Sequence, residues 1–208
     1  MTVRSSKPAF NIREKLSELT YSIGLKGREL MRAATMQDAR KVINAGRKNL
    51  IINGDMRVAQ RGTTATTGAG LNARSVDRYR LTSNQTDTVI AQGSCLYYDP
   101  PFLAGHRNYL RITNTTGTTA TGGYRELDYN AEAQDICNSG WNFNHPGSFL
   151  TLSFWVRASI THTFHVYLRT PDGTAQSYTF PIHTVANRWV KVEHRIPGSQ
   201  NITVDNDN

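Results

Sequence analysis

The chain has 208 residues, of which 38% are hydrophobic and 19% charged, and its net charge is +8. This length and composition fit one ordered globular core with room for an arm, and they exclude a disordered chain. No apolar run approaches the length of a membrane span, and the N-terminus lacks the apolar core of a signal peptide. Two cysteines, Cys95 and Cys137, do not make a disulfide framework, so we expect buried or unreactive thiols and synthesis in a reducing compartment.

The positive charge is concentrated near the N-terminus. Residues 1–48 hold 11 basic and four acidic residues, a net charge of +7, whereas the other 160 residues have a net charge of +1. A basic arm can bind nucleic acid, or it can dock on an acidic protein surface. The arm has one aromatic pair, Phe10 and Tyr21, and no interleaved arginine and aromatic residues. We therefore favour protein docking over nucleic acid as the role of the arm.

Apolar residues in the arm recur at helical spacing. Ile12, Leu16, Leu19 and Ile23 follow spacings of four, three and four, which places them on one helical face. Gly24 and Gly27 are expected to interrupt that helix, and a second short helical segment is expected from Arg28 to Ala34.

A further helix is predicted to begin near Thr35. Thr35 is followed three residues later by Asp38, which resembles a capping box with Asp in place of Glu or Gln. Met36, Ala39, Val42 and Ile43 would then share one face, and Gly46 would end the helix. Because so short a helix is marginal alone in water, its apolar stripe should pack on another chain or another protein, or back on its own β domain. The predicted docking or oligomerisation residues are Ile12, Leu16, Leu19, Ile23, Met36, Val42 and Ile43.

The segment from Asn49 to Thr63 is predicted to organise the rest of the chain. Leu50–Ile52 is suited to a buried strand, and Asn53-Gly54-Asp55 to a turn, since Asn and Gly tolerate positive φ. Met56 to Gln60 then alternates with a period of two, which predicts a half-buried strand. The Thr/Gly-rich residues 63–70 are expected to end it.

Short strands with turn residues between them are predicted for the remainder. The candidate strands are Ser75–Leu81, Val89–Ala91, Cys95–Tyr98, Tyr109–Thr113, Phe149–Arg157, His162–Arg169, Ser177–Ile182 and Trp189–His194. Residues 113–123 are expected to be a loop, and Arg125–Ile136 allows either a helical turn or a strand with a following turn. Pro171-Asp-Gly173 is a turn signal, and Pro181 suggests an edge strand or a strand end. This pattern is typical of an antiparallel sandwich or barrel.

The two strongest strands define a candidate binding face. Leu150, Leu152, Phe154 and Val156 should face the core from one strand, and Phe164, Val166 and Leu168 from the next. The residues expected on the opposite face are Trp155, Arg157, His165, Tyr167 and Arg169. Aromatic rings that stack on sugar C–H faces, beside arginine and histidine donors, are suited to glycan binding. The alternative is that another strand layer or a neighbouring subunit covers this face and that Trp155 is simply packed.

The sequence contains no recognisable catalytic or metal-binding motif. It has no Gly-x-Ser-x-Gly, no P-loop and no His-Glu-x-x-His. His162 and His165, the closest histidines, should point to opposite faces of a strand, so we expect no metal and no cofactor. A glycan-cleaving enzyme would need two carboxylates in one cleft, and the acids are too scattered to nominate a pair. We therefore expect no catalytic residues.

Several segments resemble those of bacteriophage particle proteins. Glu29 to Gly46 resembles a helical element common in phage tail fibres, which are usually trimeric. Asn49-Leu-Ile-Ile-Asn-Gly-Asp55, Leu150-Thr-Leu-Ser-Phe-Trp-Val156 and Asn187-Arg-Trp-Val-Lys-Val192 stand in the order found in jelly rolls of the carbohydrate-binding-module type in tail fibre and virion proteins. The resemblance implies a mainly β, antiparallel jelly-roll sandwich over residues 49–208, preceded by a short helical arm over residues 1–48.

Two details of the resemblance leave alternatives open. Asp55 sits where related modules can hold a structural calcium, but we favour a plain turn-capping role at this position. Such modules also continue into further strands beyond Thr203–Asn208. Either the chain is cut short, or neighbouring chains complete the sheet, or the module is a reduced variant.

The expected function is that of a phage virion structural protein, a tail fibre or fibre-like subunit made in the host cytoplasm. The arm would dock the protein on other virion proteins, as a homotrimer, and the sandwich would bind a host-surface glycan. The alternative is a capsid decoration or tail adaptor protein without glycan binding. An open face around Trp155 would favour the first function, and a face buried in a subunit contact the second.

Overall fold

The structure is a computed structural model. It describes residues 24–35, 38–39, 42, 49–67, 72–84, 88–115, 122–170, 176–198 and 202. The chain divides into two units, residues 1–48 and 49–208, each considered by itself. Within the described ranges, no helix is long and apolar enough to span a membrane.

The first unit contains the helix α2 (Leu25–Met31). Gly24 precedes the helix as its N-cap and Gly27 lies inside it, so the predicted interruption at Gly27 is wrong, and the helix begins three residues before the expected Arg28. The Arg28 amide donates to the Gly24 carbonyl across Gly27, because glycine lowers helix stability without blocking the hydrogen-bond ladder. Leu25 and Met31 are each 72% exposed.

A cap at Thr35 follows, as the sequence predicts. The Asp38 amide donates to Thr35 Oγ1 over 3.0 Å, and the Thr35 hydroxyl donates to Asp38 Oδ2 over 2.7 Å. Val42 is helical and half-buried. The other predicted docking residues, namely Ile12, Leu16, Leu19, Ile23, Met36 and Ile43, lie outside the described residues.

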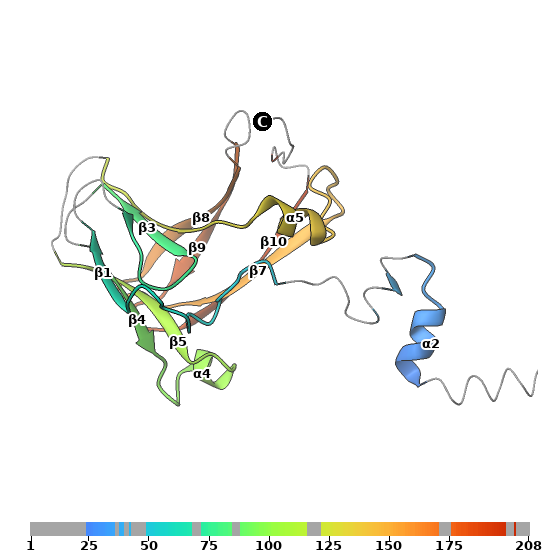
Figure 1. Ribbon diagram of the computed structural model, residues 1–208, viewed down its shortest axis with the longest axis horizontal. Helices are drawn as coiled ribbons and strands as arrows, with labels where there is room; N and C mark the ends of the chain where they lie inside the picture. The colour runs from blue at the N-terminus through green and yellow to red at the C-terminus, as the bar shows by residue number, and fades with distance from the viewer. Residues whose placement is uncertain are drawn as a thin grey trace, which may run out of the picture. The chain divides into compact units, whose positions relative to one another are not determined.

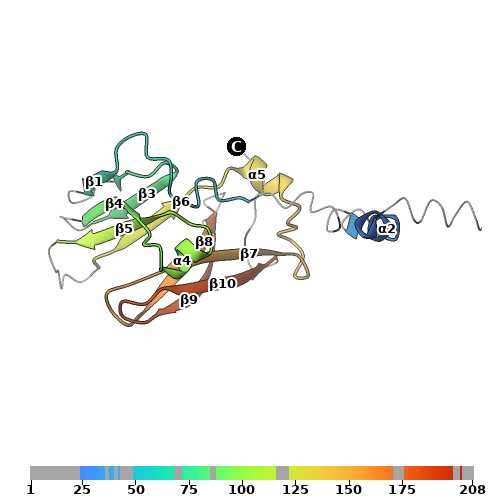
Figure 2. The same cartoon turned by 90° about the horizontal axis from the view of Figure 1, so that it is seen from below.

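The second unit is mainly β and its paired strands are antiparallel, consistent with a β-sandwich (Figures 1 and 2). The strands are β1 (Thr64–Thr67), β2 (Asn72–Ala73), β3 (Tyr79–Ser83), β4 (Thr88–Ser94), β5 (Asn108–Asn114), β6 (Arg125–Tyr129), β7 (Phe149–Val156), β8 (His162–Thr170), β9 (Gln176–Thr184) and β10 (Val190–Pro197). The short helices are α4 (Pro100–Leu103) and α5 (Ala133–Asn138).

The first half of this unit packs two three-stranded sheets on each other. One sheet has the order β1-β4-β5 and the other the order β2-β3-β6. Their shared core consists of Ala73, Leu81 and Ile90, with the half-buried Ala65 and Leu110 against it. Two of these five residues are alanines and none is aromatic, so this core is thin.

The second half packs two strand pairs, β7 with β10 and β8 with β9, around a larger core (Figure 1). The buried residues are Trp141, Phe180, Ile182, Ile196 and Ile202. The predicted inward residues of β7, from Leu150 to Val156, pack against this core, as do Val166 and Leu168 of β8. The alternation of these two strands is therefore confirmed, although Phe164 is 40% exposed.

Two contacts join the halves. The rings of Tyr109 and Trp189 meet edge to face with centroids 5.7 Å apart. Arg169 NH1 lies 3.7 Å from Glu126 Oε2, which places the ends of β8 and β6 beside each other. The halves thus form a single unit.

Residues 49–63 do not form the two predicted strands. The predicted turn at Asn53 is present, with φ of 60° at Asn53 and a hydrogen bond from the Met56 amide to the Asn53 carbonyl. Met56 itself has φ of 54°, which a strand cannot accommodate. The Tyr129 hydroxyl donates to the Leu50 carbonyl and accepts from the Ile52 amide, each over 2.8 Å. The Tyr129 side chain therefore bonds to backbone groups that would pair with a neighbouring strand if this segment were a strand.

Other predicted boundaries also change. Cys95–Tyr98 is a turn, because Asp99 Oδ2 accepts the Leu96 amide over 2.9 Å. The Thr-rich residues beginning at Thr64 form β1, and the first β3 residue is Tyr79 rather than Ser75. Residues 125–136 contain both alternatives in turn, a strand and then a helix.

The other strand predictions are confirmed. The predicted strand Val89–Ala91 lies within β4. The predicted strands at Tyr109, Ser177 and Trp189 are present as β5, β9 and β10, although Trp189 itself precedes β10. Pro181 lies inside β9, an edge strand of its two-stranded sheet. The turn predicted at residues 171–173 lies outside the described residues, and so do residues 203–208.

Candidate functional site

The five predicted glycan-binding residues do not share one face. Trp155 belongs to β7 and Arg157 follows it, whereas His165, Tyr167 and Arg169 lie on β8. β7 pairs with β10 and β8 pairs with β9, so the two groups belong to different sheets. Both sheets turn their apolar side chains toward the same core, so their polar faces point outward from opposite layers. Consecutive strands were expected to be neighbours, but the chain changes layer between β7 and β8.

Three of the five residues remain together on the outer face of the β8–β9 pair. Tyr167 is 53% exposed, with His165 and Arg169 two residues away on either side. In register, His165 lies opposite Pro181, Tyr167 opposite Thr179 and Arg169 opposite Ser177. Directly opposed residues of an antiparallel pair share a face, so an exposed ring stands among hydroxyl, imidazole and guanidinium groups.

A polar contact lies at each end of this face. Thr163 Oγ1 and His183 Nδ1 are 2.9 Å apart, which orients the His183 imidazole beside His165. At the other end Arg169 and Glu126 form an ion pair across 3.7 Å, with side chains 62% and 41% exposed. An ion pair this open contributes little stability, so the Arg169 guanidinium can exchange Glu126 for another acceptor.

Trp155 lies on the other outer face. It is half-buried and stands opposite Lys191 in the β7–β10 register. Lys191 in turn lies 3.7 Å from Glu193, and Arg195 covers the Phe149 ring at 3.5 Å from its centroid. This face is a mixed-charge surface with its aromatic rings partly covered, which is less suited to sugar stacking than the β8–β9 face.

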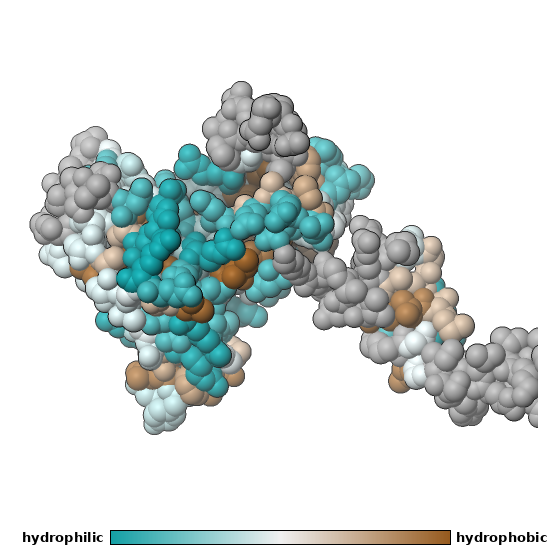
Figure 3. All heavy atoms as spheres, in the orientation of Figure 1, coloured by the Kyte–Doolittle hydropathy of each residue, from teal (hydrophilic) through white to brown (hydrophobic). Residues whose placement is uncertain are grey.

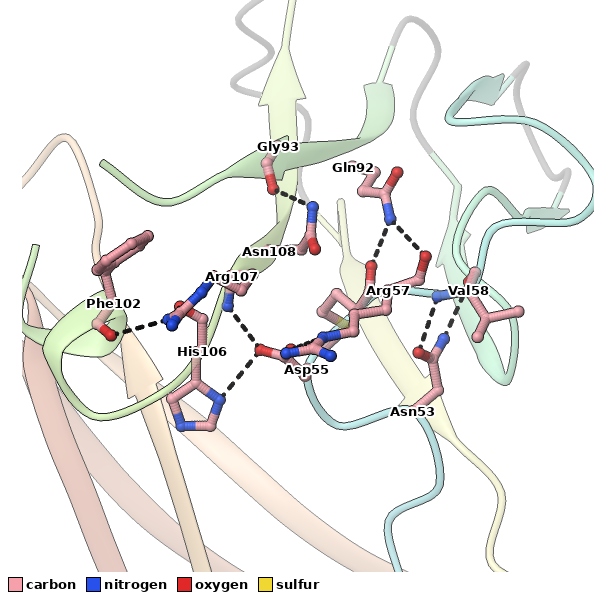
Figure 4. Close-up of polar contacts among 11 residues, drawn as sticks. Asn53, Asp55, Arg57, Val58, Gln92, Gly93, Phe102, His106, Arg107 and Asn108 are labelled. Atoms are coloured by element: carbon pink, nitrogen blue, oxygen red, sulfur yellow. Dashed lines mark hydrogen bonds and ion pairs between the residues drawn. The ribbon is translucent and has the colours of Figure 1, made fainter. Parts of the chain in front are cut away.

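Asp55 connects three segments at the start of the second unit (Figure 4). Its carboxylate pairs with the Arg57 guanidinium, accepts the Arg107 amide over 2.9 Å, and lies 3.3 Å from His106 Nδ1. Gln92 of β4 also donates to the Met56 carbonyl over 2.5 Å. The loop at residues 53–58 is therefore attached to β4 and to the residues that precede β5.

These partners decide between the two roles considered for Asp55. Burial opposes its ionisation, but the hydrogen bond from the Arg107 amide and the hydrogen bond and charge of Arg57 outweigh burial and lower the pKa of Asp55 below 3.8. Both carboxylate oxygens already face donors, which is the arrangement of a structural anchor and is unfavourable for a cation. Among the described residues, no three histidine, cysteine or acidic side chains are grouped as metal ligands.

An open hollow lies beside this anchor, with a volume of about 520 Å³. It is lined by Asn49, Ile51, Asn53, Gly54, Asp55, Arg57, Val58, Ala104, Gly105 and His106. Its carboxylate and its nearest guanidinium neutralise each other, so it offers no surplus charge to a ligand.

A second exposed aromatic surface was missed from the sequence. The β4–β5 connection exposes Leu96, Tyr97, Tyr98 and Leu103, with Tyr97 at 75% and Tyr98 at 60% (Figure 3, near α4). The Tyr97 and Tyr98 rings meet edge to face with centroids 5.0 Å apart. The available signal was Asp99-Pro-Pro directly after two tyrosines, since paired prolines are typical of a turn and end a strand.

The two cysteines occupy different environments and are not bonded to each other. Cys95 is buried, and burial, then the charges of Asp99 and Asp55, raise the pKa of its thiol above 9.0. Cys137 is exposed, so of the expected buried or unreactive thiols only Cys95 is buried. A thiol that holds its proton at neutral pH is a poor nucleophile, so Cys95 is suited to packing.

Comparison with known proteins assigns no family: no protein-family model matches the chain, and neither a curated protein nor a solved structure is similar to it. The chain's own surfaces are therefore what indicates its function. Of these surfaces, the β8–β9 face combines an exposed ring with donors and acceptors on a regular sheet, which is suited to binding.

Proposed function

We propose that this protein is a structural subunit of a phage particle, a tail fibre or fibre-like component, that attaches to a host-surface glycan through the outer face of β8 and β9. The observation that carries this proposal is Tyr167, a half-exposed ring between His165 and Arg169 on a hydrogen-bonded strand pair. The ring can stack on the apolar face of a sugar, while the imidazole and guanidinium donate to its oxygens. Paired strands hold these groups in place, which lowers the entropic cost of binding.

We also propose a jelly-roll architecture for residues 49–208. The support is the nested pairing of the second half, in which β7 pairs with β10 and encloses the β8–β9 pair. Such nesting is what results when a long hairpin folds over onto a second layer. The resemblance of residues 49–55, 150–156 and 187–192 to carbohydrate-binding modules agrees with this architecture.

The binding test is to incubate the full-length protein with an array of bacterial surface polysaccharides. We expect at least one polysaccharide to bind, and Tyr167→Ala to weaken that binding about threefold to tenfold, as the loss of one aromatic stacking contact predicts. Tyr124→Ala is the matched control, because Tyr124 is 45% exposed and lies outside this face. Binding that Tyr167→Ala leaves intact would refute the β8–β9 face as the glycan site.

The second candidate function is an adaptor or capsid decoration protein without glycan binding. It is favoured by the β4–β5 connection, where Leu96, Tyr97 and Leu103 present apolar side chains to solvent. Apolar groups of this kind are typical of protein contacts. The double variant Tyr97→Ala/Tyr98→Ala separates the two functions, since it should reduce incorporation into particles for an adaptor and leave polysaccharide binding unchanged for the β8–β9 site.

The arm is proposed to dock the subunit on other particle proteins and to assemble it as a homotrimer. Leu25 and Met31 of α2 are exposed, so α2 presents apolar surface to a partner. The test is the native mass of the full-length protein beside that of a chain beginning at Asn49. A trimer that dissociates without residues 1–48 would support the arm as the assembly element, and a monomer in both cases would exclude self-assembly through it.

A further inference from the structure

A second hollow, of about 180 Å³, lies beside β3 and β6. Four arginines and two aspartates line it: Arg61, Arg74, Arg78, Arg80, Asp77 and Asp128. Hydrophilic residues gather over β3 in this region (Figure 3). Arginines outnumber acids here, although the second unit as a whole is close to neutral, so the positive charge is local.

Two of the four arginines are already neutralised. Arg80 donates from Nε and NH2 to Asp128 Oδ2 over 3.1 and 3.0 Å. Arg78 NH1 lies 3.0 Å from Glu132 Oε1, and this bond raises the pKa of the guanidinium. The other lining acid, Asp77, accepts the Gln60 amide over 3.2 Å. These contacts hold the wall of the hollow in place. Its four arginines stand against three carboxylates, those of Asp77, Asp128 and Glu132, so the net charge at the hollow is +1.

Arg61 and Arg74 are the two arginines of the hollow that remain available to a ligand. Both side chains are exposed, and no carboxylate among the described residues pairs with either of them. Like charges that line one small hollow raise its positive potential, and a bound anion relieves that repulsion. Ser75 adds a donor, because it is 1% exposed, lines the hollow, and its Oγ makes no hydrogen bond to any described residue.

We propose that this hollow binds an oxyanion, a phosphate, sulfate or carboxylate group, with Arg61 and Arg74 as the two ligands that supply charge. The planar fork of a guanidinium matches two oxygens of such an anion, and hydrogen bonds between charged groups are the stronger kind. The volume suits one small group better than a whole sugar ring. The anion is either free or an acidic substituent of a polysaccharide, and the site does not depend on the β8–β9 face.

The experiment follows backbone amides of the full-length, isotope-labelled protein by nuclear magnetic resonance at constant ionic strength. Sodium phosphate and sodium sulfate are titrated against sodium chloride. We expect saturable shifts confined to the amides around Ser75 and Arg78 with phosphate and sulfate, and none with chloride. The same titration with an oligogalacturonate and with a neutral oligosaccharide of equal length distinguishes a polysaccharide carboxylate from a free anion.

The decisive variant is Arg61→Gln/Arg74→Gln, which keeps both ion pairs of the wall. We expect its affinity for phosphate to fall about tenfold or more, as the loss of hydrogen bonds from charged donors predicts. The control is Arg157→Gln/Arg188→Gln, which removes the same charge from exposed positions away from the hollow and should bind as the wild type does. Arg61→Lys/Arg74→Lys should retain part of the affinity, since it keeps the charge and loses the fork.

The outcomes separate this site from the proposed glycan face. Absence of saturable shifts in the wild type, or equal phosphate affinity in Arg61→Gln/Arg74→Gln and the wild type, would overturn the oxyanion site. Neither result would affect polysaccharide binding through Tyr167, which is tested by its own variant. Binding of phosphate but not of the oligogalacturonate would support a site for a free anion and overturn the polysaccharide as its source.

Discussion

The two halves of the β unit are held together in different ways. In the second half, β7–β10 enclose a core of large side chains such as Trp141, Phe180 and Ile196. In the first half, β1–β6 enclose a thin core with Leu81 and Ile90 at its centre. The segment that precedes β1 is held by hydrogen bonds that the Asn53 and Tyr129 side chains donate and that the Asp55 carboxylate accepts. Polar anchors therefore supplement the small core of the first half, and we expect different mutations to destabilise the two halves.

The largest effect is expected from the core of the second half. Phe180 is 3% exposed and stacks on the His194 ring at 3.7 Å, so Phe180→Ala should lower the free energy of unfolding by about 3–5 kcal/mol. Urea denaturation of the full-length protein measures the change. Tyr124→Ala is the surface control and should shift the free energy of unfolding by less than about 0.5 kcal/mol. A loss below about 1 kcal/mol for Phe180→Ala would mean that the large core is not what holds this half.

Backbone packing at the end of β10 gives the next effect. A Cβ on Gly198 would meet the Asn142 carbonyl oxygen and lie 2.5 Å from the His145 carbonyl oxygen. Because both atoms belong to backbone, they cannot rotate away, and Gly198→Ala should cost about 3 kcal/mol of unfolding free energy. Thermal unfolding tests this, with Gly24→Ala as the control, because Gly24 lies in open space and has φ of −54°. Equal melting temperatures for Gly198→Ala and the wild type would contradict it.

The polar anchors of the first half should yield a smaller effect. Asn53 Nδ2 donates to the Val58 and Asp77 carbonyls, and its Oδ1 accepts the Val58 amide. Asn53→Ala removes all three bonds from a residue at positive φ, and should cost about 2 kcal/mol. Hydrogen exchange should then accelerate at the Val58 amide while β7–β10 stay protected. Faster hydrogen exchange in both halves would show that the Asn53 hydrogen bonds stabilise the whole β unit and not the first half alone.

The smallest effect concerns pH. Asp55 has a pKa below its ordinary 3.8 when folded, so its contribution to stability is present at neutral pH and is lost as pH falls through the folded pKa. Asp55→Asn should therefore lower the free energy of unfolding by no more than about 1 kcal/mol near pH 7, and the difference should shrink as pH falls through the lowered folded-state pKa of Asp55. Denaturation of both proteins between pH 2.5 and pH 7 measures it. A difference in the free energy of unfolding that grows on acidification would contradict a lowered folded-state pKa for Asp55.

The parts of the fold that can be predicted from sequence are those whose pattern is local. β7, β8 and the apolar residues they bury are predictable, because alternation is a local pattern with a period of two. Residues 49–63 are not, because the partners of Leu50 and Ile52 come from Tyr129, and no local pattern encodes that contact. Three of the five face residues were grouped correctly because they lie on one strand.

The remaining errors concern long-range arrangement. Trp155 was placed with Tyr167 because consecutive strands usually neighbour each other, whereas the chain changes layer between them. The hollow between Arg61 and Arg80 joins segments on either side of β1 and β2, and only the fold brings them together.

The hydroxyl group of Tyr129 has a consequence for the order of folding. It bonds to residues 79 and 77 positions earlier in the chain, at Leu50 and Ile52. As the chain leaves the ribosome, that early segment has no partner until β6 has emerged and paired with β3, and contacts of such long sequence separation form late. The first residues of the β unit to be synthesised should thus be among the last to gain native structure, and Tyr129→Phe should speed unfolding more than it slows folding.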